Sequence, residues 1–247
     1  MHASGGILLN ESSIFLRAAN SVDVRSAVTA LTKKRYEWRG YQAPASTPQP
    51  NTMVLSAEDP VTGHPIGTIG SRIDGLEGLS CDDAFSDVVN PLREQGLQLA
   101  EFVGLATEPN SPIAALGALF HSAFLFATQV ASANYILMEI NPRHRAIYTR
   151  NLKFDVLCET RICSRARAPA LLLGQHTAIL ETHAMALIAS RAAGRSQSIL
   201  SYFFTPEEAL GVRQRLFGPA SFKPVPRTIP VKWKEPQYSD STSSEQD

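Results

Sequence analysis

The amino-acid sequence predicts an α/β domain whose mixed central sheet carries helices on both faces. Of its 247 residues, 44% are apolar and 8% aromatic, which is enough to build a substantial core. Strand and helix patterns follow one another in the order β-α-β-β-α-β-α-β-α-β-β, as α/β folds require. No charged residue occurs between Glu108 and Glu139, which is typical of a long helix buried against a sheet.

The first part of the chain begins with a flexible leader over residues 1–13 and a short strand over residues 14–18. Ser21 then has the side chain of a helix N-cap. The helix is predicted to run to about Trp38, because apolar residues recur at helical spacing from Val24 to Leu31.

A β-hairpin is predicted next. Residues 53–57 and 66–73 have strand character, and the Asp59-Pro60-Val61-Thr62-Gly63 segment between them has turn chemistry. Residues 82–95 are predicted to form a helix that ends at Gly96. Residues 97–106 are predicted to form a strand that is buried on both faces.

Residues 113–133 are apolar enough to suggest a membrane span, but their many alanines and hydroxyl groups favour a core helix. A strand follows over residues 135–140, and Pro142 opens a helix that is predicted to reach Leu152. Further strands are predicted over residues 154–159 and 168–173.

The C-terminal part is predicted to add helices over residues 178–193 and 206–217. From about Lys223 the sequence is rich in proline and then in Ser, Asp, Glu and Gln, so the last 25 residues are predicted to be disordered.

Charge excludes some partners. The 23 basic and 23 acidic residues cancel, so no net field attracts nucleic acid or anionic lipid, and no nucleic-acid module surrounds the arginines. Locally, residues 58–108 hold ten acidic and two basic groups, whereas residues 141–195 hold nine basic and three acidic groups. The two segments could attract each other, or the basic segment could dock an acidic partner.

The three cysteines, Cys81, Cys158 and Cys163, form no CxxC pair and follow no signal-peptide pattern, so we expect a reducing, cytoplasmic location. Cys158 and Cys163 with His176 and His183 lack a standard zinc spacing, and we expect no metal site.

The most informative segment is Asn141-Pro142-Arg143-His144-Arg145-Ala146-Ile147-Tyr148, followed by Leu152-Lys153-Phe154 and by Ala168-Pro169-Ala170-Leu171-Leu172-Leu173. It resembles the late strand-helix-strand of GNAT acyltransferases and, more narrowly, the N-acyl amino acid synthases related to acyl-homoserine lactone synthases. Lys153 stands where that family usually has glycine.

The resemblance implies a GNAT fold over residues 14–176, to which residues 177–222 add a C-terminal helical extension. It also implies an N-acyltransferase that moves a fatty acyl group from a thioester to the amine of an amino acid or similar small molecule. Direct attack needs no acyl-enzyme and no permanently bound cofactor.

Glu101 is the first candidate catalytic residue. In a strand it shares a face with Leu99 and Val103, and burial raises the pKa of a carboxyl group and makes it a better proton acceptor at neutral pH. It also matches a glutamate that the resembled synthases carry on their fourth strand. A structural carboxylate paired with an arginine is the alternative, and Gly104 stands where that family often has a basic residue.

Tyr148 matches the GNAT phenol that faces the departing thiolate, so the resemblance assigns it leaving-group assistance; a buried aromatic residue is the alternative. Asn141 and His144 are expected to position the loop and the substrate. Arg35 and Tyr36 resemble a synthase segment that borders the acceptor pocket. A guanidinium such as Arg35 can bind a carboxylate in two-point fashion, whereas Tyr36 could instead bury a helix end together with Trp38.

The donor prediction rests on residues 107–112. Many CoA-dependent GNAT enzymes cradle pyrophosphate here with glycine-rich backbone N–H groups. This chain has Thr-Glu-Pro-Asn-Ser-Pro, which contains a carboxylate and two prolines that donate no N–H. The donor is therefore expected to be the 4'-phosphopantetheine thioester of an acyl carrier protein, docked by Arg143, Arg145 and Arg150.

Two alternatives are left open: a CoA-dependent GNAT acetyltransferase, and a non-catalytic GNAT-like domain that binds acyl groups or regulates. We expect no transmembrane span, and a peripheral membrane contact is left open.

Overall fold

The strands form one nine-stranded mixed sheet in the order β1-β2-β3-β4-β5-β6-β9-β7, with β8 paired to β9. The computed structural model describes residues 6–9, 14–43, 51–192 and 199–218. The strands are β1 (Gly6–Leu9), β2 (Ile14–Ala18), β3 (Thr52–Glu58), β4 (Pro65–Ile73), β5 (Leu99–Thr107), β6 (Tyr135–Ile140), β7 (Asp155–Val156), β8 (Arg161–Cys163) and β9 (Ala168–His176). Among the strands of the described residues, β5 and β6 are the one pair in parallel.

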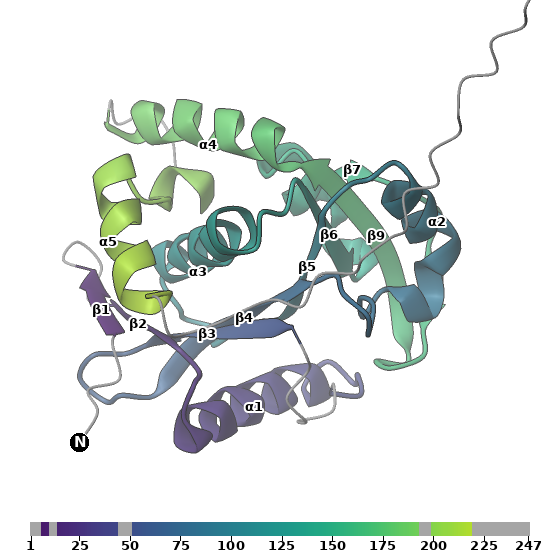
Figure 1. Cartoon of the computed structure of the whole chain (residues 1–247). Helices are drawn as coiled ribbons and strands as arrows, with labels where there is room; N and C mark the ends of the chain where they lie inside the picture. The colour runs from purple at the N-terminus through teal and green to yellow at the C-terminus, as the bar shows by residue number, and fades with distance from the viewer. Residues whose placement is uncertain (1–5, 10–13, 44–50, 193–198, 219–247) are drawn as a thin grey trace, which may run out of the picture.

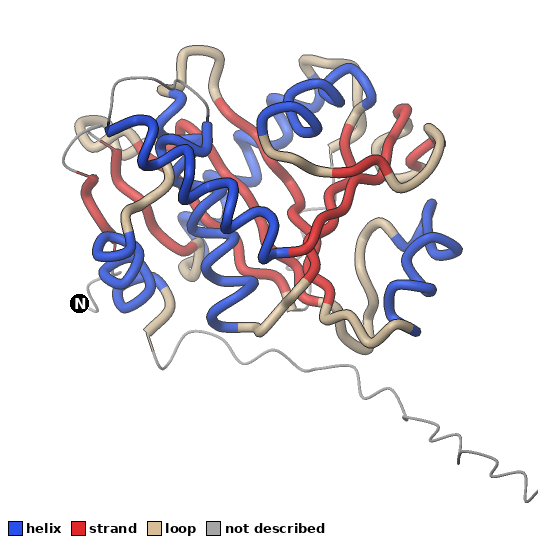
Figure 2. Tube along the Cα trace, turned by 90° about the horizontal axis from the view of Figure 1, so that it is seen from above, coloured by secondary structure: helices blue, strands red, loops and turns tan. Residues whose placement is uncertain are grey.

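Helices cover both faces of this sheet (Figures 1 and 2). The α-helices are α1 (Val22–Glu37), α2 (Asp82–Glu94), α3 (Ile113–Leu125), α4 (Thr177–Ala192) and α5 (Pro206–Leu216). Shorter helical turns are η1 (Phe126–Val130), η2 (Pro142–His144), η3 (Ile147–Asn151) and η4 (Ile199–Tyr202). The predicted α/β class with a mixed sheet is confirmed.

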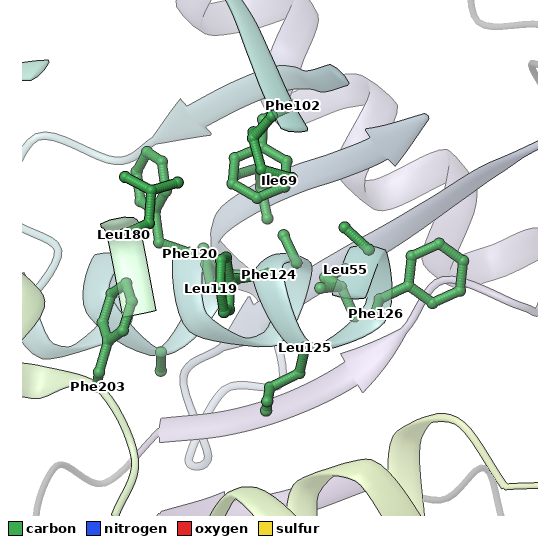
Figure 3. Close-up of a cluster of buried hydrophobic side chains, with 14 of the residues drawn as sticks. Leu55, Ile69, Phe102, Leu119, Phe120, Phe124, Leu125, Phe126, Leu180 and Phe203 are labelled. Carbon is green, nitrogen blue, oxygen red and sulfur yellow. The ribbon is translucent and has the colours of Figure 1, made fainter. Parts of the chain in front are cut away.

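The larger core lies between the sheet and α3. Leu119, Phe124 and Phe126 project among sheet residues such as Leu55 and Ile69 (Figure 3), and all five are buried. Burying one such side chain contributes roughly 1.5–3 kcal/mol to folding. On the opposite face α2 packs on β5, β6 and β9 in a second core, and α1 covers β3 in a third.

Residues 113–130 are long and apolar enough to cross a membrane, with a mean hydropathy of 1.6, but 72% of them are buried inside the protein. This is the burial of a core helix, as the sequence predicts for this segment.

Local signals explain several element boundaries. The Ser21 Oγ accepts a hydrogen bond from the Val24 N–H at 3.3 Å and begins α1. Asp59 Oδ1 accepts the N–H groups of Val61 and Thr62 and closes the β3–β4 turn. Gly96, with φ of +79°, follows the end of α2.

Four sequence predictions need correction. Strand β1 lies inside the segment predicted as a leader, and β8 was not predicted. The strand predicted over residues 154–159 shortens to β7, because only Asp155 and Val156 pair with β9. The helix predicted over residues 142–152 divides into η2 and a π-helical turn, η3. The predicted disordered tail, residues 223–247, lies outside the described residues.

Candidate active site

A cavity opens where the two parallel strands separate. Strands β5 and β6 pair from Leu99 with Tyr135 to Phe102 with Met138, and their pairing ends there. Beyond that point each strand pairs only with its outer neighbour, β4 or β9. The cavity has a volume of about 440 Å³ and is lined by the separated ends of both strands. Backbone groups on the separated edges can pair with an extended ligand, as edge strands do.

A bulge in β5 contributes to this separation. The register between β4 and β5 shifts between Thr68 and Gly70, opposite Gly104. Gly104 lines the cavity and has φ of +60°, a conformation that residues with a Cβ rarely adopt. A glycine here is therefore explained by backbone geometry. It need not reflect the loss of a basic catalytic residue.

One side of the cavity is apolar. It is formed on the α3 face of the sheet by Leu116, Phe120, Met138, Ile147 and Ile199. The rings of Phe120 and Phe102 meet edge to face, with centroids 6.1 Å apart. This surface suits a hydrocarbon chain and has no charged group of its own.

The other side of the cavity carries cationic groups. Arg35, Arg39 and Arg143 all line it. Arg35 and Arg39 both lie over the Trp38 ring, with guanidinium carbons 4.7 and 4.1 Å from the ring centroid. Trp38 itself is 62% exposed, so Trp38 does not bury the helix end, and the alternative stays open for Tyr36 alone.

The loop after β6 leads into the helical turn η2, and Asn141 caps the N-terminus of that turn. Asn141 Oδ1 accepts the Arg143 N–H at 3.2 Å, and Asn141 Nδ2 donates to the Tyr41 hydroxyl at 3.0 Å. His144 Nε2 accepts from Arg143 Nε at 2.9 Å. Burial, and then Arg143 and Arg39, lower the pKa of His144, which favours the neutral ring. The predicted positioning residues Asn141 and His144 thus both line the cavity.

Glu139 is the carboxylate that lines the cavity, and sequence reasoning missed it. It lies on β6, on the face that α2 covers, and its side chain is 12% exposed. The Arg165 Nη2 donates to it, and the Cys163 thiol is a second side-chain hydrogen-bond partner. Arg165 also pairs with Asp83 at 2.9 Å, so this guanidinium has two carboxylate partners.

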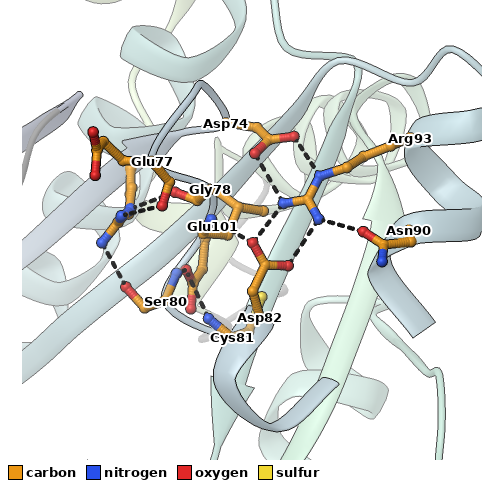
Figure 4. Close-up of polar contacts among 11 residues, drawn as sticks. Asp74, Glu77, Gly78, Ser80, Cys81, Asp82, Asn90, Arg93 and Glu101 are labelled. Atoms are coloured by element: carbon orange, nitrogen blue, oxygen red, sulfur yellow. Dashed lines mark hydrogen bonds and ion pairs between the residues drawn. The ribbon is translucent and has the colours of Figure 1, made fainter. Parts of the chain in front are cut away.

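Glu101 lies deeper, at the point where β5 and β6 still pair. It is 1% exposed and is absent from the cavity lining. The backbone N–H groups of Ser80 and Cys81, just before α2, donate to its Oε2 at 2.6 and 3.3 Å (Figure 4). Burial raises the pKa of Glu101 to about 7, against the opposing effect of Arg165. The catalytic role of Glu101 stays a prediction. It requires that a proton be relayed between the cavity and the Glu101 carboxylate.

This pKa predicts a pH dependence of stability. The ordinary value is 4.5, so between pH 4.5 and about 7 the folded protein holds a proton that the unfolded chain has released. The Glu101 contribution to stability is fully present below pH 4.5 and is lost as the pH rises through about 7, a loss of up to about 3 kcal/mol.

Urea unfolding at about pH 5 and about pH 8 measures this dependence in the wild type and in Glu101→Gln, which has no titrating proton at this position. We expect the fall in unfolding free energy between the two pH values to be smaller in the variant. The same fall in both proteins would show that Glu101 does not titrate in this range.

Two phenols meet in the cavity. Tyr148, from η3, lines it, and its ring centroid is 6.4 Å from that of Phe120. Burial, and then Tyr36, raise the pKa of Tyr148 to about 12. Burial, and then Glu139, raise the pKa of Tyr36, which also lines the cavity. Both hydroxyls are therefore protonated at neutral pH and can donate hydrogen bonds.

The loop over residues 107–112 is a poor phosphate cradle. The Glu108 N–H donates to the Ile66 carbonyl at 2.9 Å, and the Ser111 N–H to the Glu108 carbonyl at 3.2 Å. The Glu108 carboxylate pairs with Lys34 at 2.7 Å. Two of the few N–H groups are thus already engaged, one with β4 and one inside the loop, and a carboxylate lies beside them, which disfavours a pyrophosphate.

The basic segment divides into two sets of arginines. Arg161 pairs with Asp87 at 2.6 Å, and Arg165 pairs with Asp83. These two arginines therefore join the basic segment to the acidic segment. Arg143, Arg145 and Arg150 are exposed. Of these three only Arg143 lines the cavity. Among the described residues, no group of three or more His, Cys, Asp and Glu side chains could hold a metal ion.

Comparisons with known proteins show what the chain is similar to. Residues 27–176 match the family model described as N-acyl amino acid synthase FeeM. The solved structure of FeeM, an N-acyl amino acid synthase from uncultured soil microbes, superposes with a TM-score of 0.62 at 22% identity, over 70% of this chain and 95% of that one.

Two further solved structures are more distant. An acyl-CoA N-acyltransferase from Pseudomonas aeruginosa matches at 12% identity over 66% of this chain and 97% of that chain, with a TM-score of 0.43. A spermidine N-acetyltransferase from Vibrio cholerae matches at 11% identity over 68% and 96%, with a TM-score of 0.44. No curated protein sequence matches the chain.

Proposed function

Because the chain belongs to the N-acyl amino acid synthase FeeM family, and so is a GNAT-fold N-acyltransferase, we propose that its donor is a fatty acyl thioester of an acyl carrier protein and its acceptor an amino acid or similar small amine. The observation that carries the proposal is the cavity between β5 and β6, which is apolar on the α3 face and cationic on the other side. A fatty acyl chain fits the first and an amino-acid carboxylate the second.

The proposed reaction is direct acyl transfer. The amine nitrogen attacks the thioester carbonyl carbon, a C–N bond forms, and Glu139 accepts the proton that the nitrogen loses. Backbone N–H groups on the separated strand edges stabilise the oxyanion. The C–S bond then breaks, and the Tyr148 hydroxyl donates a hydrogen bond or a proton to the departing thiolate. The products are an N-acyl amine and the free pantetheine thiol.

Arg35 is proposed to bind the acceptor carboxylate. Arg35 lines the cavity, and its guanidinium lies over the Trp38 ring, a contact that helps to orient its donor groups. Arg39 and Arg143 add positive charge at the same side, where the single phosphate of pantetheine could also be neutralised.

A carrier protein as donor is supported by the phosphate loop and the exposed arginines. The Glu108 loop disfavours the pyrophosphate of CoA, whereas pantetheine on a carrier protein brings one phosphate. Carrier proteins of fatty acid synthesis are acidic, so exposed arginines would raise the association rate, and salt would reduce it. Arg145 and Arg150 are the best-suited docking residues, because they are exposed and do not line the cavity.

The test compares donors. The purified protein is given a mixture of amino acids and the same acyl group as a carrier-protein thioester, as acyl-CoA or as acyl-pantetheine, and the N-acyl product is measured by mass spectrometry. We expect kcat/KM for the carrier thioester to exceed that for acyl-CoA by about tenfold or more and to fall with added salt. Equal use of acyl-CoA without salt dependence would instead support the CoA-dependent alternative.

A charge reversal localises the docking surface. Arg145→Glu with Arg150→Glu is expected to raise KM for the carrier thioester several-fold and to leave the acyl-pantetheine reaction unchanged. The matched control reverses two exposed arginines on α5, Arg213 and Arg215, and should change neither. An equal effect of both pairs would mean that total charge, and no docking surface, controls association.

A further inference from the structure

The C-terminal extension, residues 177–192 and 199–217, lies beyond residue 176, where the match to the family model ends. It packs on the face of α3 that the sheet leaves open, and Leu180 and Phe203 join the core there (Figure 3). Its buried apolar residues in η4, in α5 and in the residues beside them include Ile199, Leu200, Phe203, Phe204, Val212 and Leu216.

The contact between η4 and α3 is a close approach of two backbones. A Cβ added at Gly117 would lie 2.7 Å from the Tyr202 Cβ and 2.8 Å from the Ile199 carbonyl oxygen. Both distances are too short for any side chain, so η4 can occupy this position only because residue 117 is glycine. The position of Ile199 relative to α3 is thereby closely fixed.

His121 provides a second anchor. Its Nδ1 accepts the Phe204 N–H at 2.7 Å, and its ring stacks on Phe203 and Phe204 with centroids 4.5 and 5.0 Å away. Burial lowers the pKa of His121 to about 3, so the ring remains neutral and keeps its acceptor nitrogen at neutral pH. The extension is thus held over α3 by the Gly117 approach and by His121.

Among the described residues of the extension, one lines the cavity. Ile199 is the part of the extension that lines the cavity, where it joins Leu116, Phe120 and Ile147 on the apolar side. Glu139 lies on the face of the sheet opposite to Met138, and Arg35 belongs to α1, which packs on that opposite face, so the far end of a bound hydrocarbon chain points toward the layer that supplies Ile199.

We propose that Ile199 forms the end wall of the acyl compartment and limits the length of the acyl chain that the enzyme accepts. This inference rests on the proposed N-acyl transfer. Ile199 belongs to the C-terminal extension. The preference for acyl-chain length is therefore set by a segment outside residues 27–176, which match the family model.

A competition experiment tests the proposal. Wild type, Ile199→Ala and Ile199→Phe each receive an equimolar mixture of saturated acyl donors from octanoyl to stearoyl, and the ratio of long-chain to short-chain N-acyl products is measured. The ratio compares donors on the same enzyme molecules, so it does not depend on how much enzyme is folded. We expect Ile199→Ala to raise the ratio about tenfold and Ile199→Phe to lower it about tenfold. Each methylene of the acyl chain that becomes buried, or can no longer be buried, changes the binding constant roughly fourfold.

Leu200→Ala is the matched control. Leu200 lies in the same turn and is buried, but it does not line the cavity, so its truncation loosens the extension without opening the compartment. We expect the wild-type product ratio in this variant. A shift as large as that of Ile199→Ala would overturn the proposal and attribute chain length to looseness of the extension. Ile199→Val, a smaller change in the same direction, replaces Ile199→Ala if the latter does not fold.

A second readout does not require turnover. The rise in Tm given by acyl-pantetheines of increasing length reports binding. The chain length that gives the largest rise should increase in Ile199→Ala. An unchanged profile of Tm and of products would overturn the role of Ile199. A wild type that binds acyl-pantetheines but forms no N-acyl product from any donor would overturn the proposed function, while the Tm profile would still decide the role of Ile199.

Discussion

Glu139→Gln is expected to lower kcat/KM for N-acyl transfer by about 10²- to 10³-fold while the fold is retained. The substitution keeps the volume of the side chain and removes its ability to take a proton from the attacking amine. Arg165 keeps its pairing with Asp83, so no guanidinium is left without a carboxylate partner. Steady-state kinetics with a carrier-bound donor measure the loss, and circular dichroism checks the fold.

Glu101→Gln is the comparison that assigns the proton acceptor. If Glu139 contacts the amine, the Glu101 variant should lose much less activity, because Glu101 does not line the cavity. A large loss in Glu101→Gln with near-normal activity in Glu139→Gln would return the role to Glu101. In that case the activity of the wild type should rise with pH through about 7, where Glu101 loses its proton.

The fold could be predicted wherever local patterns decide it. The bounds of β2 and β6 agree with the predicted strands, and Ser21 and Gly96 lie where the helix ends were expected. Lys153 is a further case. It stands where the resembled family has glycine, and its φ of +59° shows that the turn keeps the conformation that glycine adopts without strain.

The missed elements depend on partners that are distant in sequence. Strand β8 has three residues and exists through its pairing with β9, and β1 pairs with β2 from inside a segment with few strand signals. Neither has a periodic pattern long enough to identify it alone. The π-helical turn η3, which presents Tyr148 to the cavity, likewise has no sequence signature, although such turns often occur at functional sites.

The candidate site was predicted in part for the same reason. Arg35, Tyr36, Asn141, His144 and Tyr148 were found from their motifs, and all line the cavity. Glu139 was missed although a signal existed, since it is a carboxylate on a strand whose other residues are apolar. Which of Glu101 and Glu139 reaches the cavity is decided by where β5 and β6 separate, and that depends on the register of both strands with their outer neighbours.

Arg93→Met is expected to lower the free energy of unfolding by about 3–5 kcal/mol. Arg93 is 6% exposed and binds two carboxylates (Figure 4), with Nε 2.7 Å from Asp74 Oδ2 and Nη2 2.7 Å from Asp82 Oδ2. Methionine fills part of the space but leaves both carboxylates without their cation. The cost arises because largely buried charges lose their partner and gain little water in exchange.

Arg161→Met is the matched control, since it removes the same kind of side chain from a pair in which Asp87 is 65% exposed. It should cost much less than Arg93→Met, because water solvates the freed carboxylate. Adding Asp82→Asn to Arg93→Met removes one unpaired charge and should recover part of the loss. Urea unfolding of all these variants measures the differences, and equal losses in Arg93→Met and Arg161→Met would contradict a special cost of burial.

The Arg93 network also connects stability to the site. Asp82 Oδ2, which Arg93 holds, accepts the Leu79 N–H at 2.7 Å, and the next two N–H groups along the chain, of Ser80 and Cys81, are those that bind Glu101. Losing Arg93 should therefore loosen the turn before α2 and weaken the hold on the Glu101 carboxylate. In Arg93→Met the pH dependence of stability attributed to Glu101 should change, whereas in Arg161→Met it should stay as in the wild type. An unchanged pH dependence in Arg93→Met would mean that the turn holds Glu101 without the network.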